Sequence, residues 1–110
     1  MGIIAFYAGL NGTDNIVQTV EDIPDQNFAP ANNGIVKSVK LCGVRAGCVI
    51  KALDSPGGDM HDGFCIIQVK RTHSEYTVDT FERSYEDEYV VVTFVRSTQQ
   101  GSQIHRIKID

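Results

Sequence analysis

Two groups of acidic residues supply oxygen ligands of the kind that a metal ion binds. Asp54, Asp59 and Asp62 lie in a glycine-rich stretch, and residues 86–88 read Glu-Asp-Glu. Carboxylate oxygens are the ligands that calcium prefers. Neither group has the spacing of an EF-hand loop. Acidic turns are usually only solvated turns, so calcium binding at each group is an alternative rather than the main interpretation.

Three cysteines and a histidine supply the ligand types of a zinc site. A Cys3His zinc site could be assembled by number from Cys42, Cys48, Cys65 and His61, but no Cys-x-x-Cys pair is present. An odd number of cysteines does not predict a disulfide framework. We predict free, buried thiols that pack as small apolar side chains. The alternative is a Cys42–Cys48 bridge across the turn at residues 43–47.

No residues are spaced as a nucleophile with its base. Ser55 and Ser84 lie outside a Gly-x-Ser-x-Gly turn. Any Cys-His pairing is equally unmarked by spacing. The glycine-rich residues 54–59 precede no expected helix, which argues against a phosphate site. The sequence therefore predicts a protein that is not an enzyme, with no catalytic residue and no cofactor other than the calcium alternative.

Tyrosine is the aromatic residue available for sugar binding, because the chain has no Trp. Tyr85 adjoins an acidic run, and the candidate ligand-binding residues are accordingly Tyr85, Glu86, Asp87 and Glu88. Their expected ligand is a carbohydrate or a cell-surface component. The simpler interpretation is that the tyrosines pack on or beside strands.

Short strands must position all of these side chains. Val and Ile together number 23 against three Leu, and β-branched residues favour pleated strands over helices. We expect strands separated by Gly-, Pro- and Asn-rich turns at residues 3–7, 15–20, 35–41, 48–53, 64–70, 76–81, 89–96 and 104–109. The predicted fold is all-β, a two-sheet β-sandwich of about eight strands. Residues 21–34 are expected as a loop, and the apolar run 89–95 as a central strand covered on both faces.

Length and charge limit the partners. A chain of 110 residues predicts a single domain, residues 1–110. A net charge of −4 argues against nucleic acid as a partner. Residues 1–36 lack Lys and Arg, whereas Lys37, Lys40, Arg45 and Lys51 form a basic stretch. We interpret that stretch as solvated strand faces, with a groove for an acidic partner as the alternative.

Segments that direct a protein to a membrane are not evident. No run of 18 apolar residues predicts a membrane span. The first residues lack the basic region and cleavage site of a signal peptide, so a cytoplasmic location is expected, with export by another route as the alternative. The sequence leaves open whether the partner is a protein or a carbohydrate. It also leaves open whether the chain is a monomer or a homodimer.

Two parts of the chain resemble each other. Strands Ile35–Leu41 and Ile104–Ile109 have similar sequences, and each closes a segment that opens with a strand and a glycine turn. We interpret the chain as two copies of one motif, at about residues 1–43 and 44–110. The second copy is longer, so it is expected to contain an extra hairpin near residues 71–95.

The repeat resembles the Greek-key motif of the βγ-crystallin superfamily, in particular its single-domain microbial members. In that family an aromatic residue is followed six residues later by Gly, as Phe6 is by Gly12. The hairpin folds back over the ring, and Gly takes the positive φ this requires. Residues 38–41 match the family's closing strand, and residues 106–109 depart from it at their first residue. Ala52 stands where the second aromatic belongs. The resemblance implies a crystallin-like, two-sheet Greek-key β-sandwich with a diverged second motif.

Many microbial members of this superfamily bind calcium through two Asn/Asp residues, two variable residues, Ser/Thr and Ser. Residues 33–38 occupy this motif, but Gly34 lacks a side-chain oxygen and Lys37 replaces the hydroxyl ligand with an ammonium group. At most, weak calcium binding is implied. The candidate ligands, two from this motif and two from the acidic stretch, are Asn33, Ser38, Asp54 and Asp59.

The resemblance implies a passive role, as a structural or stress-related protein or as a binding module. Rigid strands would hold variable loops at residues 8–14, 21–34, 54–63 and 82–88. One alternative is a carbohydrate- or cell-surface-binding module that uses the Tyr85 region. Another is a secreted inhibitor or toxin that acts through its loops.

Overall fold

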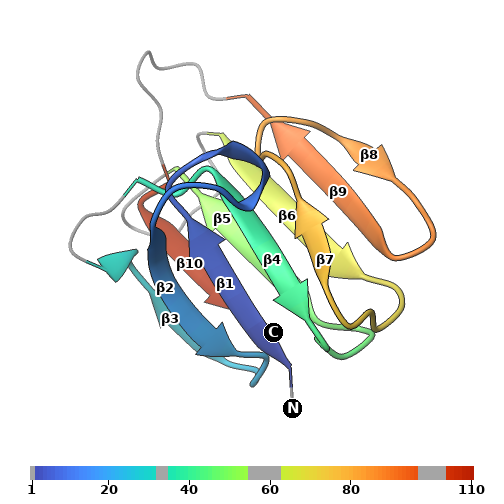
Figure 1. Cartoon of the computed structure of the whole chain (residues 1–110). Coiled ribbons are helices and arrows are strands. Elements are labelled where there is room, and N and C mark those ends of the chain that lie inside the picture. The colour runs from blue at the N-terminus through green and yellow to red at the C-terminus, as the bar shows by residue number, and fades with distance from the viewer. Residues whose placement is uncertain (1, 32–34, 55–62, 97–103) are drawn as a thin grey trace.

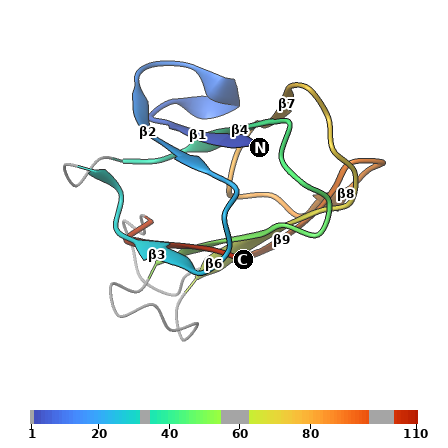
Figure 2. The same ribbon diagram turned by 90° about the horizontal axis from the view of Figure 1, so that it is seen from below.

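Two antiparallel β-sheets face each other in the computed structural model, which describes residues 2–31, 35–54, 63–96 and 104–110 (Figures 1 and 2). The first sheet has the strand order β2-β1-β4-β7, and the second has the order β3-β10-β5-β6-β9-β8. The strands are β1 (Ile3–Tyr7), β2 (Ile16–Glu21), β3 (Gln26–Phe28), β4 (Ser38–Cys42), β5 (Val49–Leu53), β6 (Phe64–Val69), β7 (Tyr76–Val78), β8 (Tyr85–Glu86), β9 (Val90–Val95) and β10 (Arg106–Ile109). The predicted all-β sandwich is confirmed.

Helical structure is nearly absent from this part of the chain. One 3-10 turn, η1 (Leu10–Gly12), is the helical element of the described residues. Among these residues no helix has the length and hydrophobicity needed to cross a bilayer.

Each sheet contains one strand from the other half of the chain. Strand β3 joins the sheet formed by β5, β6, β8, β9 and β10, and β7 joins the sheet formed by β1, β2 and β4. The two sheets also share a register: Phe6 of β1 lies opposite Val39 of β4, and Ala52 of β5 lies opposite Ile107 of β10. Phe6 and Ala52 therefore occupy corresponding central positions in the two sheets.

The core fills the space between the sheets. Alternate residues of each strand point inward, as the period of two in a strand requires. The largest fully buried side chains of this core include Phe6, Ile4, Ile50, Ile67, Ile107 and Ile109. Burial of each such side chain contributes about 1.5–3 kcal/mol to folding.

Two strands lie where no strand was expected. Residues 21–34 contain β3, and the charged connection before residue 89 contains β8. β3 pairs with β10, and Phe28 packs edge-on against Phe6 with ring centroids 6.2 Å apart. β8 pairs with β9, which places an antiparallel pair within residues 71–95. Both strands are too short for a hydrophobic period, so tertiary pairing rather than local pattern creates them.

Strand β9 differs from the expected central strand covered on both faces. It is next to the edge strand β8, and its inward residues Val90 and Val92 are buried. Thr93 and Val95 on its other face are exposed. An apolar run alone cannot distinguish a covered face from a solvated one.

A serine in the core holds the hairpin between β1 and β2. Gly12 has φ of +66°, which confirms the positive φ expected for it. Its N–H donates to the Ser38 hydroxyl at 2.8 Å, and that hydroxyl donates to the Gly9 carbonyl at 2.6 Å. The hairpin also reaches the segment after β7, because the Asn11 N–H donates to the Asp79 carbonyl at 2.8 Å. These bonds fold η1 back over one end of the sandwich (Figure 1).

Candidate ligand-binding cavity

A cavity of ≈ 230 Å³ opens at this end of the sandwich. Its floor is a row of inward residues in the second sheet: Ala52 of β5 lies opposite Cys65 of β6, and Cys65 lies opposite Phe94 of β9. Ala52 is 2% exposed and corresponds in register to Phe6. Because alanine has no ring, space remains here that an aromatic side chain fills in the other half.

The roof and walls come from three segments that backbone hydrogen bonds hold. These segments contribute Leu10 of η1, Val36 and Phe81 to the lining. The N–H of Lys37 donates to the Tyr7 carbonyl at 2.8 Å, which fixes the chain just before β4. The cavity is therefore preformed on anchored backbone, as small-molecule sites usually are.

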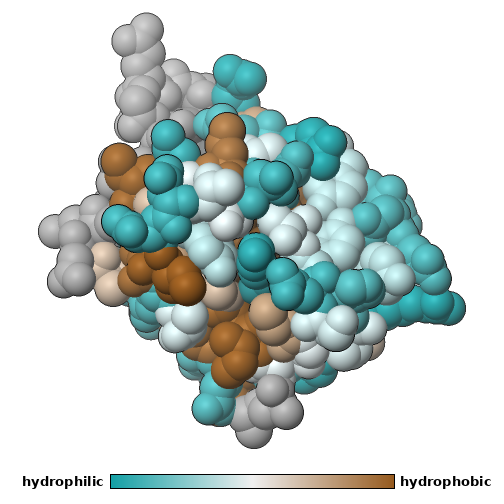
Figure 3. All heavy atoms as spheres, viewed as in Figure 1, coloured by the Kyte–Doolittle hydropathy of each residue, from teal (hydrophilic) through white to brown (hydrophobic). Residues whose placement is uncertain are grey.

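Apolar side chains also border the opening of the cavity. Leu10 is 55% exposed and Ile35 is 51% exposed. Figure 3 shows hydrophobic surface at the η1 end and over the β1–β2 side of the molecule, whereas the β8–β9 side is hydrophilic. Large exposed apolar side chains beside a cavity are a common feature of binding sites.

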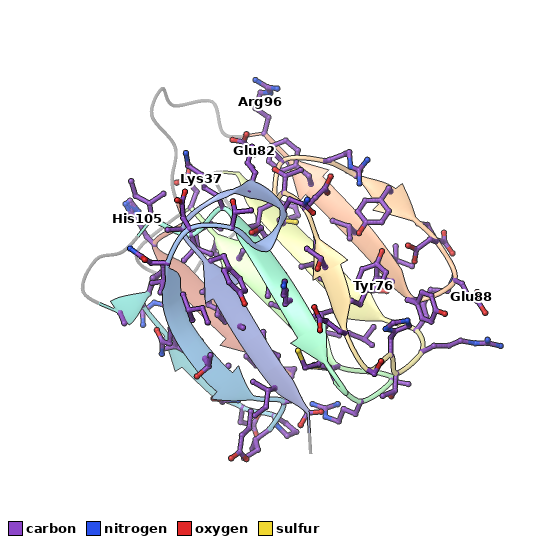
Figure 4. All side chains as sticks on the ribbon, viewed as in Figure 1. Lys37, Tyr76, Glu82, Glu88, Arg96 and His105 are labelled. Atoms are coloured by element: carbon purple, nitrogen blue, oxygen red, sulfur yellow. The ribbon has the colours of Figure 1, made fainter. Side chains whose placement is uncertain are left out.

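Charged residues stand at the rim. Lys37, Asp54 and Glu82 all line the cavity, and Figure 4 shows Lys37 and Glu82 at the same end of the sandwich. The Glu82 N–H donates to the Thr80 hydroxyl at 3.0 Å, which fixes the start of that segment. Lys37 and Glu82 are exposed, and neither forms a salt bridge with another described residue.

Cys48 and Cys65 are buried in the core as predicted, whereas Cys42 is only half-buried. All three thiols are free, so the alternative Cys42–Cys48 bridge is not formed. Burial raises the pKa of Cys65 to about 12, which keeps this thiol protonated and unreactive on the cavity floor. His61, the histidine considered as a zinc ligand, lies outside the described residues.

The candidate calcium ligands are only partly placed. Asn33 and Asp59 lie outside the described residues. Ser38 is fully buried and its hydroxyl joins Gly9 to Gly12, while Asp54 lies at the cavity rim. Within the described ranges no three His, Cys, Asp or Glu side chains are grouped as a metal site.

The second candidate set, Tyr85 to Glu88, does come together, on β8 and the turn that follows it. Its acids pair with the connection between β6 and β7: Lys70 Nζ lies 2.9 Å from Glu86, and Arg71 lies 2.7 Å from Glu88. The Arg83 guanidinium lies over the Tyr85 ring, 4.4 Å from its centroid. A sugar that stacks on that face of the ring would have to displace the guanidinium.

Asp87 joins this set to the other sheet. The hydroxyl of Tyr76 in β7 donates to the Asp87 carboxylate and lies 2.9 Å from the Tyr85 hydroxyl. His73 and Tyr89 pack edge to face, with ring centroids 4.7 Å apart. These contacts close the sandwich between its edge strands β7 and β8, well away from Lys37 (Figure 4).

The pKa values at this edge follow from the contacts. Burial, together with hydrogen bonds to Asp87 and Tyr85, raises the pKa of Tyr76. Burial alone would raise the pKa of Asp87, but the Tyr76 hydroxyl and the N–H groups of Tyr89 and Val90 hold it below its ordinary value of 3.8. A carboxylate with a lowered pKa stabilises the fold above its unfolded-state pKa, and this contribution is lost as pH falls through the folded-state value.

Replacement of Tyr76 by Phe should therefore lower stability at neutral pH by about 1 kcal/mol and weaken the dependence of stability on acid. Thermal melts from about pH 7 to about pH 2 would measure both effects. Asp87→Asn should flatten the same acid limb, whereas the exposed Asp25→Asn should not. An unchanged acid limb in both edge variants would contradict this assignment.

The basic stretch seen in the sequence does not form a groove. Lys40 lies 3.4 Å from Glu75 and over the Tyr7 ring, whereas Arg45 binds the buried Asp22 through both side-chain and backbone groups. Lys51 is on β5 and Lys37 is at the cavity rim. Because Lys40 and Lys51 belong to different sheets, the fold gives no support to the alternative of a groove for an acidic partner at this stretch.

Apart from Asp54, which was a candidate calcium ligand, the residues of the cavity were not identified as site residues from the sequence. Phe94, Phe81 and Glu82 come from segments that show no motif, and only the missing aromatic at Ala52 gave a sign of the space. Comparison of the chain with protein-family models, with curated proteins and with solved structures found no match. The function is therefore argued from geometry alone.

Proposed function

We propose that this protein is a non-enzymatic binding module of crystallin-like architecture, and that its cavity binds a small apolar molecule. The observation that carries the proposal is the preformed cavity of ≈ 230 Å³ over the Ala52–Cys65–Phe94 row. Apolar walls provide affinity, and a few polar groups at the rim orient a ligand.

The crystallin-like part of the proposal has two supports. One is the exchange of β3 and β7 between the sheets together with the shared register of Phe6 and Ala52. The other is the Ser38 hydroxyl, which holds the folded-back hairpin at Gly12 in the copy that matches the family's closing strand. Both features are expected of two Greek-key motifs derived from one unit.

The size of the cavity limits the ligand. A dry cavity of about 150 Å³ is large enough for benzene, and sites for drug-sized ligands span about 300–1,000 Å³. A volume of ≈ 230 Å³ lies between these, so it suits a single ring or a short branched chain with a small substituent.

Calcium binding has less support from the geometry. The Ser38 hydroxyl is already bonded to two backbone groups, and Lys37, the residue before it, carries an ammonium group that supplies no lone pair. A carbohydrate site at Tyr85 is likewise weakened by the Arg83 stack and the two ion pairs beside it. Loss of glycan-array binding in Tyr85→Ala would restore that alternative.

Ethylbenzene, a neutral probe of suitable size, should bind the wild-type protein with a dissociation constant of about 0.1–1 mM. It should also raise the melting temperature, because a ligand that binds only the folded state stabilises it. Ala52→Phe should abolish binding by filling the cavity, and NMR shift changes in the wild type should centre on Phe94 and Phe81.

The matched control is Ala46→Phe, which adds the same ring at an exposed turn and should leave binding intact. If Ala52→Phe overpacks the core and does not fold, Ala52→Leu and the wild-type shift map still decide the question. Shift changes remote from the cavity, or full binding by a folded Ala52→Phe variant, would overturn the proposed function.

A further inference from the structure

We propose that the ligand of this cavity is an apolar α-amino acid, bound with its side chain in the cavity, its carboxylate on Lys37 and its ammonium group on Glu82. The inference rests on the proposed function of the cavity and adds the chemistry of the ligand's polar end. Charge at the rim carries it.

Opposite charges share this rim without neutralising each other. Lys37 and Glu82 both line the opening, and no salt bridge joins them. Their backbone positions are fixed, since the Lys37 N–H bonds to the Tyr7 carbonyl and the Glu82 N–H bonds to the Thr80 hydroxyl. The rim therefore presents one cation and one anion, on backbone that these bonds hold, beside an apolar space.

A dipolar head group matches this arrangement better than a singly charged one. A ligand with only a carboxylate would be attracted by Lys37 but repelled by Glu82. A ligand with only an ammonium group would be attracted by Glu82 but repelled by Lys37. An α-amino acid carries both charges on one carbon, next to the side chain that enters the cavity.

The apolar part of such a ligand also fits. The benzyl side chain of phenylalanine adds one methylene to a benzene ring, for which about 150 Å³ suffices, and the cavity offers ≈ 230 Å³. Val36, Phe81 and Phe94 would surround the ring. A polar amino acid side chain would lose its hydration there without regaining hydrogen bonds.

Calorimetric titrations with four probes that share a phenyl ring test the inference: L-phenylalanine, phenylpropionate, phenylethylamine and neutral ethylbenzene. L-Phenylalanine should bind about fivefold more tightly than either singly charged analogue, the effect of one exposed ion pair. Lys37→Met should weaken the binding of L-phenylalanine and strengthen the binding of phenylethylamine. Glu82→Gln should weaken the binding of L-phenylalanine and strengthen the binding of phenylpropionate.

Control variants remove the same charges elsewhere. Lys51→Met on β5 and Glu21→Gln on β2 should leave all four affinities unchanged. If ethylbenzene binds but L-phenylalanine binds no more tightly than its analogues, the amino-acid inference fails and the cavity's proposed function stands. If ethylbenzene and the other probes all fail to bind, the proposed function fails as well.

Discussion

Truncation of Phe6 to alanine should lower the free energy of unfolding by about 3–5 kcal/mol. Phe6 is fully buried, lies between β2 and β4 in the first sheet, and packs edge-on against Phe28 of the second sheet. Its removal takes away the contacts that this ring makes with both sheets, and it leaves a void that the paired backbone cannot close. Because small domains are stable by only about 5–15 kcal/mol, the variant should be close to unfolding at physiological temperature.

Urea denaturation followed by circular dichroism would measure this loss, with Tyr7→Ala as the matched control. Tyr7 is the next residue of the same strand, and its half-buried ring points to the Lys40 side instead of the core. The control should lose no more than about 1–2 kcal/mol. Equal losses in the two variants would mean that Phe6 is not the centre of the core.

Most of the strands could be predicted from the sequence because their residues report burial directly. The alternation of Cys65, Ile67 and Val69 against solvent-facing residues identified β6, and β-branched residues marked β1, β5 and β9 in the same way. β3 and β8 escaped prediction because a strand of only two or three residues exists through its partner strand and shows no period of its own.

The candidate site was harder to predict than the strands. Ala52 was recognised as a departure from the repeat, but a missing ring indicates space only when the neighbouring strands are known. Lys37 and Glu82 lie far apart in the chain, and the fold-back of η1 and the exchange of β7 bring them to one rim. By contrast, the acids at residues 86–88 were conspicuous in the sequence, yet Lys70 and Arg71 pair with two of them.

Ser38→Ala should cost about 2–3 kcal/mol of stability, although the change removes one oxygen atom. The Ser38 hydroxyl accepts from the Gly12 N–H and donates to the Gly9 carbonyl, and Ser38 is 0% exposed. Without it, both backbone groups lose their partner where water has little access. Because this hairpin also forms the roof of the cavity, the variant should bind ethylbenzene more weakly than the wild type does.

Ser84→Ala is a close control for this prediction. Ser84 likewise bonds to two backbone groups, accepting from the Phe94 N–H at 2.8 Å and donating to the Phe94 carbonyl at 3.3 Å, but it is exposed. Water can replace its hydroxyl, so the loss should stay within about 0.5 kcal/mol.

Melts repeated with added calcium separate the two roles considered for Ser38. A structural hydroxyl predicts the same loss with and without calcium, whereas calcium stabilisation that disappears in Ser38→Ala would identify Ser38 as part of a metal site.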